Sequence, residues 1–358
     1  MKTENKKYFI TVSDFEAFLN ILGKQGKVYT PSIVSGRRQE TPFFSYKRKA
    51  LEDKFEYFGF RPSQPLKTFL FSGRMKVAEY SGTSVEFHPA EKTIIAGAAA
   101  CDVESLKSLD AVFLQDNFTD IFYRDKRNSS FIISMDCTHP RETCLCTLAG
   151  INPYPESGFD LNLSKITDGY IIETGSKKGE KAVVQNLQFF STVNDKILNE
   201  RNENRSEIIS KVKNFNKTYL LSKSRREILE INRKSTEWFK HVQTCIECAA
   251  CLFACPTCHC FLLFDQTTDT PEKFQRVKEW DSCSYAGYSR MAGGSSPRVG
   301  IMERFRHRYL HKFEYFPKNF GFEACTGCGR CVEGCMGRID MRKVLKSMDE
   351  TPIGVKNQ

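Results

Sequence analysis

The sequence predicts an α+β fold, in which an N-terminal mixed α/β domain is followed by an α-helical domain rich in cysteine. Short runs of β-branched and aromatic residues, broken by Gly, Pro and Ser, occur throughout the first ~230 residues. Beyond about residue 240 few such runs occur, and two related cysteine motifs are separated by helix-like stretches. A chain of 358 residues is long enough for two domains, which we expect at residues 1–235 and 236–358.

The expected elements of the first domain follow from local patterns. Four runs are predicted to be strands: "KTFLFSG", "KTIIAG", "SSFIISM" and "DGYIIETG". Residues 102–115 are predicted to be a helix, because Val103, Leu106, Leu109, Val112 and Phe113 share one helical face. A charged helix over residues 221–242 is expected to connect the domains, and "MERFRHRYLHKF" is a helix-like stretch of the second domain.

The 15 cysteines bear on the compartment in which the protein works. The start of the chain has charged residues on both sides of a very short apolar segment, which is unlike a secretory signal. No apolar run approaches the ~18 residues that a membrane helix needs. We therefore expect a cytoplasmic protein, without a membrane partner, whose cysteines bind metal rather than form disulfides.

Two motifs share the spacing C-x2-C-x2-C-x3-C. They consist of Cys245, Cys248, Cys251 and Cys255, and of Cys325, Cys328, Cys331 and Cys335. This spacing lets a tightly turning loop place three thiolates at adjacent corners of a [4Fe-4S] cluster, while its amides stabilise their charge. In two-cluster ferredoxins the fourth cysteine binds the other cluster.

The crossed arrangement assigns the ligands of two [4Fe-4S] clusters. One cluster is expected on Cys245, Cys248, Cys251 and Cys335, and the other on Cys325, Cys328, Cys331 and Cys255. Zinc is the alternative, but a zinc site usually takes two pairs of ligands, and the repeated motif fits it poorly. Residues 256–324 separate the motifs, and this long insertion favours a helical dicluster domain over the compact bacterial ferredoxin.

A further group of cysteines occurs in the first domain, in "CTHPRETCLC" and "AAACDVESL". It comprises Cys101, Cys137, Cys144 and Cys146. Cys101 follows a predicted strand and begins a predicted helix, whose N-terminal amides favour an anionic ligand. We expect a third iron-sulfur cluster here; a structural zinc or metal-free cysteines are the alternatives.

Three cysteines have no place in these sites. Cys258 and Cys260 follow the first motif, and Cys283 lies in "EWDSCSY". We favour a packing role beside the clusters, since buried free cysteines behave as small apolar residues. A further ligand site or a redox-active pair is the alternative.

The formal charge of +10 raises the question of nucleic acid. Residues 295–313 hold basic side chains among aromatic ones, namely Arg298, Arg304, Arg306, Arg308 and Lys312. No RNA- or DNA-binding motif accompanies them, so a solvated helix face or cations placed beside anionic clusters is the preferred interpretation. The sequence has no P-loop and no dinucleotide fingerprint, which argues against flavin or NAD binding by this chain.

Taken in order, these features resemble a known family. "ACDVESLKSLDAVFL", "CTHPRETCLC", "GFDLNLSKITDGYIIETG", "CIECAACLFACPTCHCF", "WDSC" with "MAGG", and "CTGCGRC" are similar to the iron-sulfur electron-transfer subunits of anaerobic sulfite reductase and of cytoplasmic sulfhydrogenases, which are nickel-iron hydrogenases (beta subunit). The resemblance covers about residues 65 to 345. Met336 stands where proline is usual, and Leu145 replaces a common phenylalanine.

The resemblance implies an α-helical ferredoxin-type domain with two [4Fe-4S] clusters, and it supports the upstream cysteines as metal ligands. It also implies a soluble oxidoreductase complex, in which this subunit relays electrons between a flavoprotein subunit, oxidising NAD(P)H or ferredoxin, and a catalytic subunit with siroheme or nickel-iron. No catalytic site of its own is then expected in this chain. The alternative is a disulfide- or sulfur-reducing oxidoreductase that uses Cys258, Cys260 or Cys283 beside a cluster.

Overall fold

A computed structural model describes residues 5–33, 44–50, 52–80, 90–269 and 273–351. The chain forms two compact units. The first comprises Met1–Leu70 and His88–Phe215, and the second comprises Phe71–Phe87 and Asn216–Gln358. The expected domain boundary at 235/236 falls inside the second unit and stays a prediction.

The first unit is built on a mixed sheet of eight strands in the order β3-β2-β5-β6-β7-β8-β1-β9. Strands β2, β5, β6 and β7 are parallel neighbours, and the flanking strands are antiparallel. The strands are β1 (Lys7–Ile10), β2 (Lys27–Ile33), β3 (Phe44–Arg48), β5 (Thr93–Ala99), β6 (Ser130–Met135), β7 (Leu161–Ile166), β8 (Gly169–Thr174) and β9 (Ser191–Thr192). Its helices are α1 (Val12–Gly23), α2 (Lys67–Leu70), α3 (Ala100–Phe113), α4 (Ile121–Ser129), α5 (Lys177–Val184) and α6 (Asp195–Phe215), with short 3-10 turns η1 (Asp116–Phe118), η2 (Cys146–Ala149) and η3 (Leu187–Phe189).

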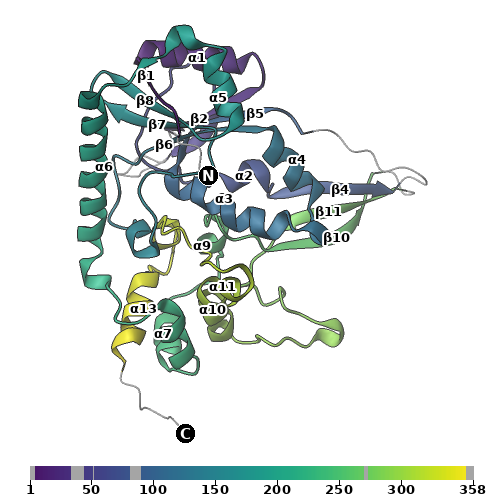
Figure 1. Ribbon diagram of the computed structural model, residues 1–358. Helices are drawn as coiled ribbons and strands as arrows, with labels where there is room; N and C mark the ends of the chain where they lie inside the picture. Colours follow the sequence, from purple (N-terminus) through teal and green to yellow (C-terminus); the bar gives the residue numbers. More distant parts are fainter. Residues whose placement is uncertain (1–4, 34–43, 51, 81–89, 270–272, 352–358) are drawn as a thin grey trace. The chain divides into compact units, whose positions relative to one another are not determined.

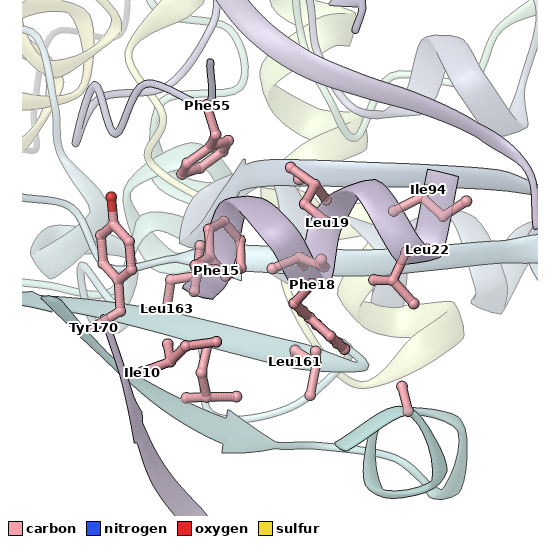
Figure 2. Packing of buried hydrophobic residues seen from close by; sticks show 14 of the residues in the cluster. Ile10, Phe15, Phe18, Leu19, Leu22, Phe55, Ile94, Leu161, Leu163 and Tyr170 are labelled. Atoms are coloured by element: carbon pink, nitrogen blue, oxygen red, sulfur yellow. The ribbon is translucent and has the colours of Figure 1, made fainter. Parts of the chain in front are cut away.

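One face of this sheet carries the main apolar core. Figure 2 shows Phe15, Phe18 and Leu22 of α1 lying against side chains of the strands, including Leu161 and Leu163. Ala182 and Val183 of α5 belong to the same cluster. Burial of these side chains supplies the apolar contacts that hold α1 and α5 to the sheet.

The other face is partly polar and is covered by α3 and by α6, the long teal helix in Figure 1. Arg205 of α6 donates to both carboxylate oxygens of Asp136 (Nε to Oδ2, 2.7 Å; Nη2 to Oδ1, 3.2 Å) and to Glu173 Oε2 at 2.9 Å. Arg201 pairs with the second oxygen of Glu173 at 2.6 Å. Opposite charges that satisfy one another in this way make the burial of carboxylates on a sheet face tolerable. The network fixes Asp136, which immediately precedes Cys137.

The second unit combines short helices with a three-stranded antiparallel sheet of order β10-β11-β4. Its strands are β4 (Arg74–Tyr80), β10 (Phe261–Thr267) and β11 (Phe274–Trp280). Its helices are α7 (Arg225–Ile231), α8 (Glu237–Val242), α9 (Ala250–Phe253), α10 (Ile301–Leu310), the π-helix η6 (His311–Tyr315), α11 (Phe316–Phe320), α12 (Arg330–Glu333) and α13 (Met341–Glu350), with 3-10 turns η4 (Lys217–Tyr219) and η5 (Ala292–Gly294). The mixture of sheet and helix in the first unit and the helical content of the second agree with the α+β class.

Several local predictions are confirmed, and others are wrong. "KTIIAG", "SSFIISM" and "DGYIIETG" are the strands β5, β6 and β8, and the helix expected over 102–115 is α3. "KTFLFSG", expected as a strand, begins instead with the helical turn α2. The chain turns helically directly after Pro65, since Thr68 N–H donates to Pro65 O at 3.1 Å and Phe69 N–H donates to Leu66 O at 3.2 Å.

The helix expected over 221–242 is two helices, α7 and α8. The first ends just before Asn232, whose side-chain amide donates to Ile228 O at 2.9 Å and to Met348 O at 3.1 Å. Trp238 of α8 donates its indole N–H to Asn232 O at 2.8 Å. Asparagine side chains compete in this way with the helical backbone, so the chain turns before α8 begins.

Within the part of the chain that the structure describes, no helix is long and apolar enough to cross a membrane.

Candidate metal centres

The two cysteine loops have the same backbone conformation. In the first loop Glu247 (φ 55°) and Ala249 (φ 56°) are left-handed, and in the second the equivalent residues Gly327 (φ 63°) and Gly329 (φ 75°) are left-handed. Each loop then enters a short helix, α9 or α12. A left-handed residue other than glycine costs roughly 1 kcal/mol or more, and such strain concentrates at functional sites. The shared conformation therefore reflects a shared task of the two loops.

Ion pairing holds the strained first loop in place. Arg304 of α10 is buried and donates from Nε to Glu247 Oε1 at 3.0 Å and to Ser284 O at 2.9 Å. The same guanidinium also donates to Arg298 O at 3.1 Å. Glu247 is thus fixed through its side chain while its backbone keeps the left-handed turn.

Backbone amides in both loops point at cysteine sulfur atoms. The N–H of Glu247 and that of Gly327 donate to Cys245 and Cys325, respectively, and each of these bonds lowers the pKa of the thiol. Burial is the larger effect and raises both pKa values. Ile339 N–H donates to Cys335 Sγ at 3.3 Å. These donors stabilise a thiolate, which is the form of cysteine that binds metal.

The first group of cysteines lines one pocket. Its lining includes Cys245, Cys248, Cys251 and Cys335, the four cysteines of the first crossed set, together with Cys331, Arg304 and Arg308. The charges of Cys251 and Cys335 both act on Cys245 and raise its pKa further. The fourth cysteine of the second motif therefore lies with the first three of the first motif.

The second group shows the reciprocal arrangement. Burial raises the pKa of Cys331 to about 12, and the charges of Cys328, Cys255 and Cys325 contribute to that rise. Cys255 and Cys328 likewise raise the pKa of Cys325. The fourth cysteine of the first motif thus lies with the first three of the second motif.

Two hydrogen bonds tie the motifs together at their ends. Thr244, just before the first motif, donates its hydroxyl to Gly337 O at 2.8 Å, just after the second. Thr257, just after the first motif, donates to Ala324 O at 2.8 Å, just before the second. A Cβ on Gly337 would lie 2.2 Å from Thr244 O, so this close approach requires glycine. Met336, where proline is usual in the family that the sequence resembles, is 73% exposed and carries no packing role here.

Two cations are buried beside these cysteines. Lys312 is 3% exposed, and its ammonium donates to Cys255 Sγ at 3.3 Å, Thr257 Oγ1 at 3.0 Å and Ala324 O at 2.9 Å. Burial lowers the pKa of Lys312, but Cys255, Cys258 and Cys325 raise it by more. These contacts correct the expectation of a solvated helix face and agree with cations placed beside anionic groups.

Arg308 indicates more strongly than Lys312 that an anionic group binds between these cysteines. Its Nε and Nη2 are buried and have no hydrogen-bond partner among the described atoms. Burial lowers its pKa, and the charges of Cys251 and Cys331, one from each group, raise it by more. The hydroxyl groups of Tyr309 and Thr326 are also buried without partners in the described part of the chain. Unpaired buried donors are costly, so this region fits a group that carries negative charge and acceptor atoms.

The upstream cysteines lie where two parallel strands end. Strand β5 pairs with β6 so that Ala99 is opposite Met135. Cys101 and Cys137 each follow two residues later, so both leave the same edge of the sheet. Cys101 lies in the first turn of α3. We infer from this register that Cys101 and Cys137 lie at the same edge of the sheet.

Cys144 and Cys146 complete this group. Burial raises the pKa of Cys137, and the charges of Cys144 and Cys146 raise it further. The His139 N–H and the Arg61 guanidinium act in the opposite direction, favouring a thiolate. Cys137, Cys144 and Cys146 are therefore neighbours, and Leu145 between the last two is buried.

The remaining cysteines pack beside the first motif. Cys283 is buried in an apolar cluster with Ala249 and Leu252, against which Cys258, Cys260 and Cys251 of the first motif pack. Within the described residues, no three His, Cys, Asp or Glu side chains have the arrangement of a site for a single metal ion.

The comparisons with known proteins address the same residues. Residues 244–339 match the model of the 4Fe-4S dicluster domain. The chain is 32% identical over 337 residues to the sulfhydrogenase 2 subunit beta of Pyrococcus furiosus, an alignment that covers 94% of this chain and 96% of the relative. This chain belongs to the sulfhydrogenase beta-subunit family.

Membership in the sulfhydrogenase beta-subunit family gives the cysteine motifs their function. A dicluster domain binds iron-sulfur clusters, so the chain is an iron-sulfur electron-transfer subunit. The sequence identified the dicluster cysteines from their spacing and placed Arg308 among the cations that could lie beside the clusters. It did not identify Tyr309 or Thr326, and it did not show that Arg308 is buried. The spacing of Arg304, Arg308 and Lys312 by four residues was the available signal, since such residues share one face of a helix.

Proposed function

We propose that this subunit relays electrons within a cytoplasmic, anaerobic oxidoreductase complex. The donor is a flavoprotein subunit that oxidises NAD(P)H or ferredoxin, and the acceptor is a catalytic subunit with a nickel-iron site or siroheme. The observation that carries the proposal is the pair of crossed cysteine groups together with Arg308. The buried Nε and Nη2 of Arg308 have no hydrogen-bond partner among the described atoms, and a cysteine of each group raises its pKa. Neither nucleic acid nor a membrane is a partner in this proposal.

The ligand sets follow the crossed grouping. One [4Fe-4S] cluster is held by Cys245, Cys248, Cys251 and Cys335, and the other by Cys325, Cys328, Cys331 and Cys255. The clusters supply one-electron transfer. The buried Arg308 and Lys312 would stabilise the negative charge that a bound cluster gains on reduction, because solvent screens their charges poorly. No residue of the relay acts as a catalytic group on a substrate.

A third [4Fe-4S] cluster on Cys101, Cys137, Cys144 and Cys146 extends the proposal. Its support is the shared strand edge of Cys101 and Cys137 and the closeness of Cys137 to Cys144 and Cys146. Metal analysis tests it directly, because three cubanes contain about twelve irons per chain and two contain about eight.

The function is tested with the isolated, anaerobically purified chain. We expect iron-sulfur absorption and reversible reduction by dithionite, with no turnover of hydrogen, sulfite or polysulfide. When the chain is isolated from its natural source, it should carry a flavoprotein and a nickel-iron or siroheme subunit with it. Turnover of any of these substrates by the isolated chain would refute the relay, and co-purification with neither subunit would refute the proposed partners.

A further inference from the structure

The three cysteines outside the proposed ligand sets are brought together by the hairpin of β10 and β11. Phe261 at the start of β10 pairs with Trp280 at the end of β11. Cys260 precedes Phe261, and its carbonyl accepts a hydrogen bond from Asp281 N–H at 3.0 Å. The hairpin register therefore brings Cys283, two residues after Asp281, to Cys260.

The sulfur atoms of Cys260 and Cys283 interact directly. The Cys283 thiol donates a hydrogen bond to Cys260, and so does the Cys283 backbone N–H. The Tyr288 hydroxyl is a third donor to Cys260. Both residues are thiols rather than a disulfide in this structure. Three donors on one sulfur mark Cys260 as the thiolate of the pair.

The two thiols differ in environment. The hydrogen bond from Cys283 lowers the pKa of Cys260 to about 6, whereas that bond and burial raise the pKa of Cys283. Cys283 is 5% exposed, while Cys260 is partly accessible. An accessible thiolate beside a buried, protonated thiol is the division of roles that thiol-disulfide exchange requires.

We propose that Cys260 and Cys283 are a redox-active dithiol that reduces low-molecular-weight disulfides, with Cys260 as the attacking thiolate and Cys283 as the resolving thiol. This site adds a redox role to the packing role expected for the two residues, which their apolar cluster confirms. The proposal goes beyond the electron relay proposed above. It depends on that relay only for the electrons that reduce the cysteine pair again.

The exchange is balanced in two steps. The Cys260 thiolate attacks a disulfide R–S–S–R, forming a Cys260–S–S–R mixed disulfide and releasing RS⁻. Cys283 then loses its proton to the released thiolate and attacks the Cys260 sulfur, forming the Cys260–Cys283 disulfide and releasing the second RS⁻. Two electrons pass from the cysteine pair to the substrate, which leaves as RSH and RS⁻. Two electrons from the relay and one proton restore the Cys260 thiolate and the Cys283 thiol.

Cys258 provides the matched control. It lies in the same cluster, where its charge contributes to the raised pKa of Cys283, but it is neither the attacking nor the resolving thiol of the proposed pair. Its removal should therefore leave the exchange intact.

The experiment uses the holoprotein, prereduced and kept anaerobic, with glutathione disulfide as the probe and mass spectrometry of alkylated peptides as the readout. The wild-type chain and Cys258→Ser should form a Cys260–Cys283 disulfide. Cys283→Ser should stop at a glutathione adduct on Cys260, and Cys260→Ser should form neither product. At pH 7, iodoacetamide should alkylate Cys260 about 10-fold faster than an ordinary exposed thiol, since thiolate fraction governs the rate.

Iron content and cluster reduction are measured on the same samples. They should be unchanged in Cys260→Ser and Cys283→Ser, because neither residue belongs to the proposed ligand sets. Absence of the Cys260–Cys283 disulfide in the wild type, or loss of iron in Cys260→Ser, would overturn the inference. Clusters that reduce normally without exchange at Cys260 would leave the relay standing alone, whereas exchange without reducible clusters would reject the relay and keep the pair.

Discussion

Arg308 is a buried cation that lies beside both cysteine groups, because Cys251 of one group and Cys331 of the other both raise its pKa. It lies buried beside Cys251 and Cys331 without a carboxylate partner among the described residues. Replacing it with methionine keeps length and apolar contact but removes the positive charge. At an effective dielectric of ~20 one charge about 6 Å away is worth about 3 kcal/mol. Arg308→Met should therefore lower a cluster reduction potential by on the order of 100 mV for one electron.

Potentiometric titration followed by electron paramagnetic resonance measures this shift. Arg306→Met is the matched control, because Arg306 lies on the same helix but donates to Arg233 O at 2.7 Å. Iron content of both variants shows whether the clusters have assembled. Equal potentials in Arg308→Met and Arg306→Met at full iron content would contradict the electrostatic role.

Cys255 tests the crossed grouping itself. Its sulfur lies with Cys325, Cys328 and Cys331 rather than with the motif to which it belongs in sequence. Cys255→Ala should therefore disturb the same cluster signal as Cys325→Ala, while Cys335→Ala should disturb the same signal as Cys245→Ala. Each variant should lose up to about four irons, the content of one cubane. If Cys255→Ala and Cys245→Ala gave the same spectral change, the grouping would be uncrossed.

The sequence predicts the roles of some of these residues but not of others. The cysteine grouping was predicted from the loop spacing, which brings three thiolates together, and from the crossed fourth ligand of two-cluster ferredoxins. The ligand assignment stays a prediction, and the effects of these cysteines on one another's pKa values support it. The burial of Arg308 and Lys312 could not be predicted, since a stretch of basic and aromatic residues is also typical of a solvated helix face. The contact between Cys260 and Cys283 depends on hairpin register, which pairs positions far apart in the sequence.

At the scale of elements, α10 and the π-helix η6 carry two histidines, His307 and His311, that make the stability of the fold sensitive to pH. His311 begins the π-helix that follows α10, with its ring centroid 5.6 Å from that of His259 and 6.1 Å from that of His307. Burial, together with the charges of His259, Lys312 and His307, lowers the pKa of His311 to about 3. Burial likewise lowers the pKa of His307 to about 4.

The sign of the pH effect follows from these directions. An unfolded histidine has a pKa of about 6.5. Below that pH, His311 and His307 are protonated in the unfolded chain but stay neutral in the folded chain. The free energy of unfolding should fall as the pH drops from about 6.5 toward 4, by up to ~1.4 kcal/mol per pH unit for His311. Urea unfolding between pH 7.5 and 5.5 measures the slope. His311→Gln should flatten it, and an unchanged slope in that variant would contradict the assignment to His311.

The strands of the second unit show why some elements escaped prediction. In β10, Leu262 is 51% and Leu263 is 49% exposed, so burial does not alternate along the strand as it does in a half-buried sheet. The partner of β11 on its other side is β4, from a part of the sequence almost two hundred residues earlier. Strands β5, β6 and β8 were predictable because both of their faces are buried and their apolar runs are continuous.

At the scale of the whole molecule, the cysteines are divided between two compact units. Cys101, Cys137, Cys144 and Cys146 belong to the first unit, and the two crossed groups belong to the second. Each unit has its own sheet and its own buried residues. Loss of a metal group from one unit should therefore leave the ligands of the other in place.

Cys144→Ala tests this independence together with the third cluster. Cys144 is buried beside Cys137, so its removal should cost the upstream group its metal while both dicluster signals keep their potentials. Iron analysis should fall from about twelve to about eight per chain, at four irons per cubane. Cys258→Ala, a control of the same chemistry outside the proposed ligand sets, should keep all the iron. A wild-type chain with about eight irons, unchanged in Cys144→Ala, would show that the upstream cysteines hold no cluster and that the relay runs through the second unit alone.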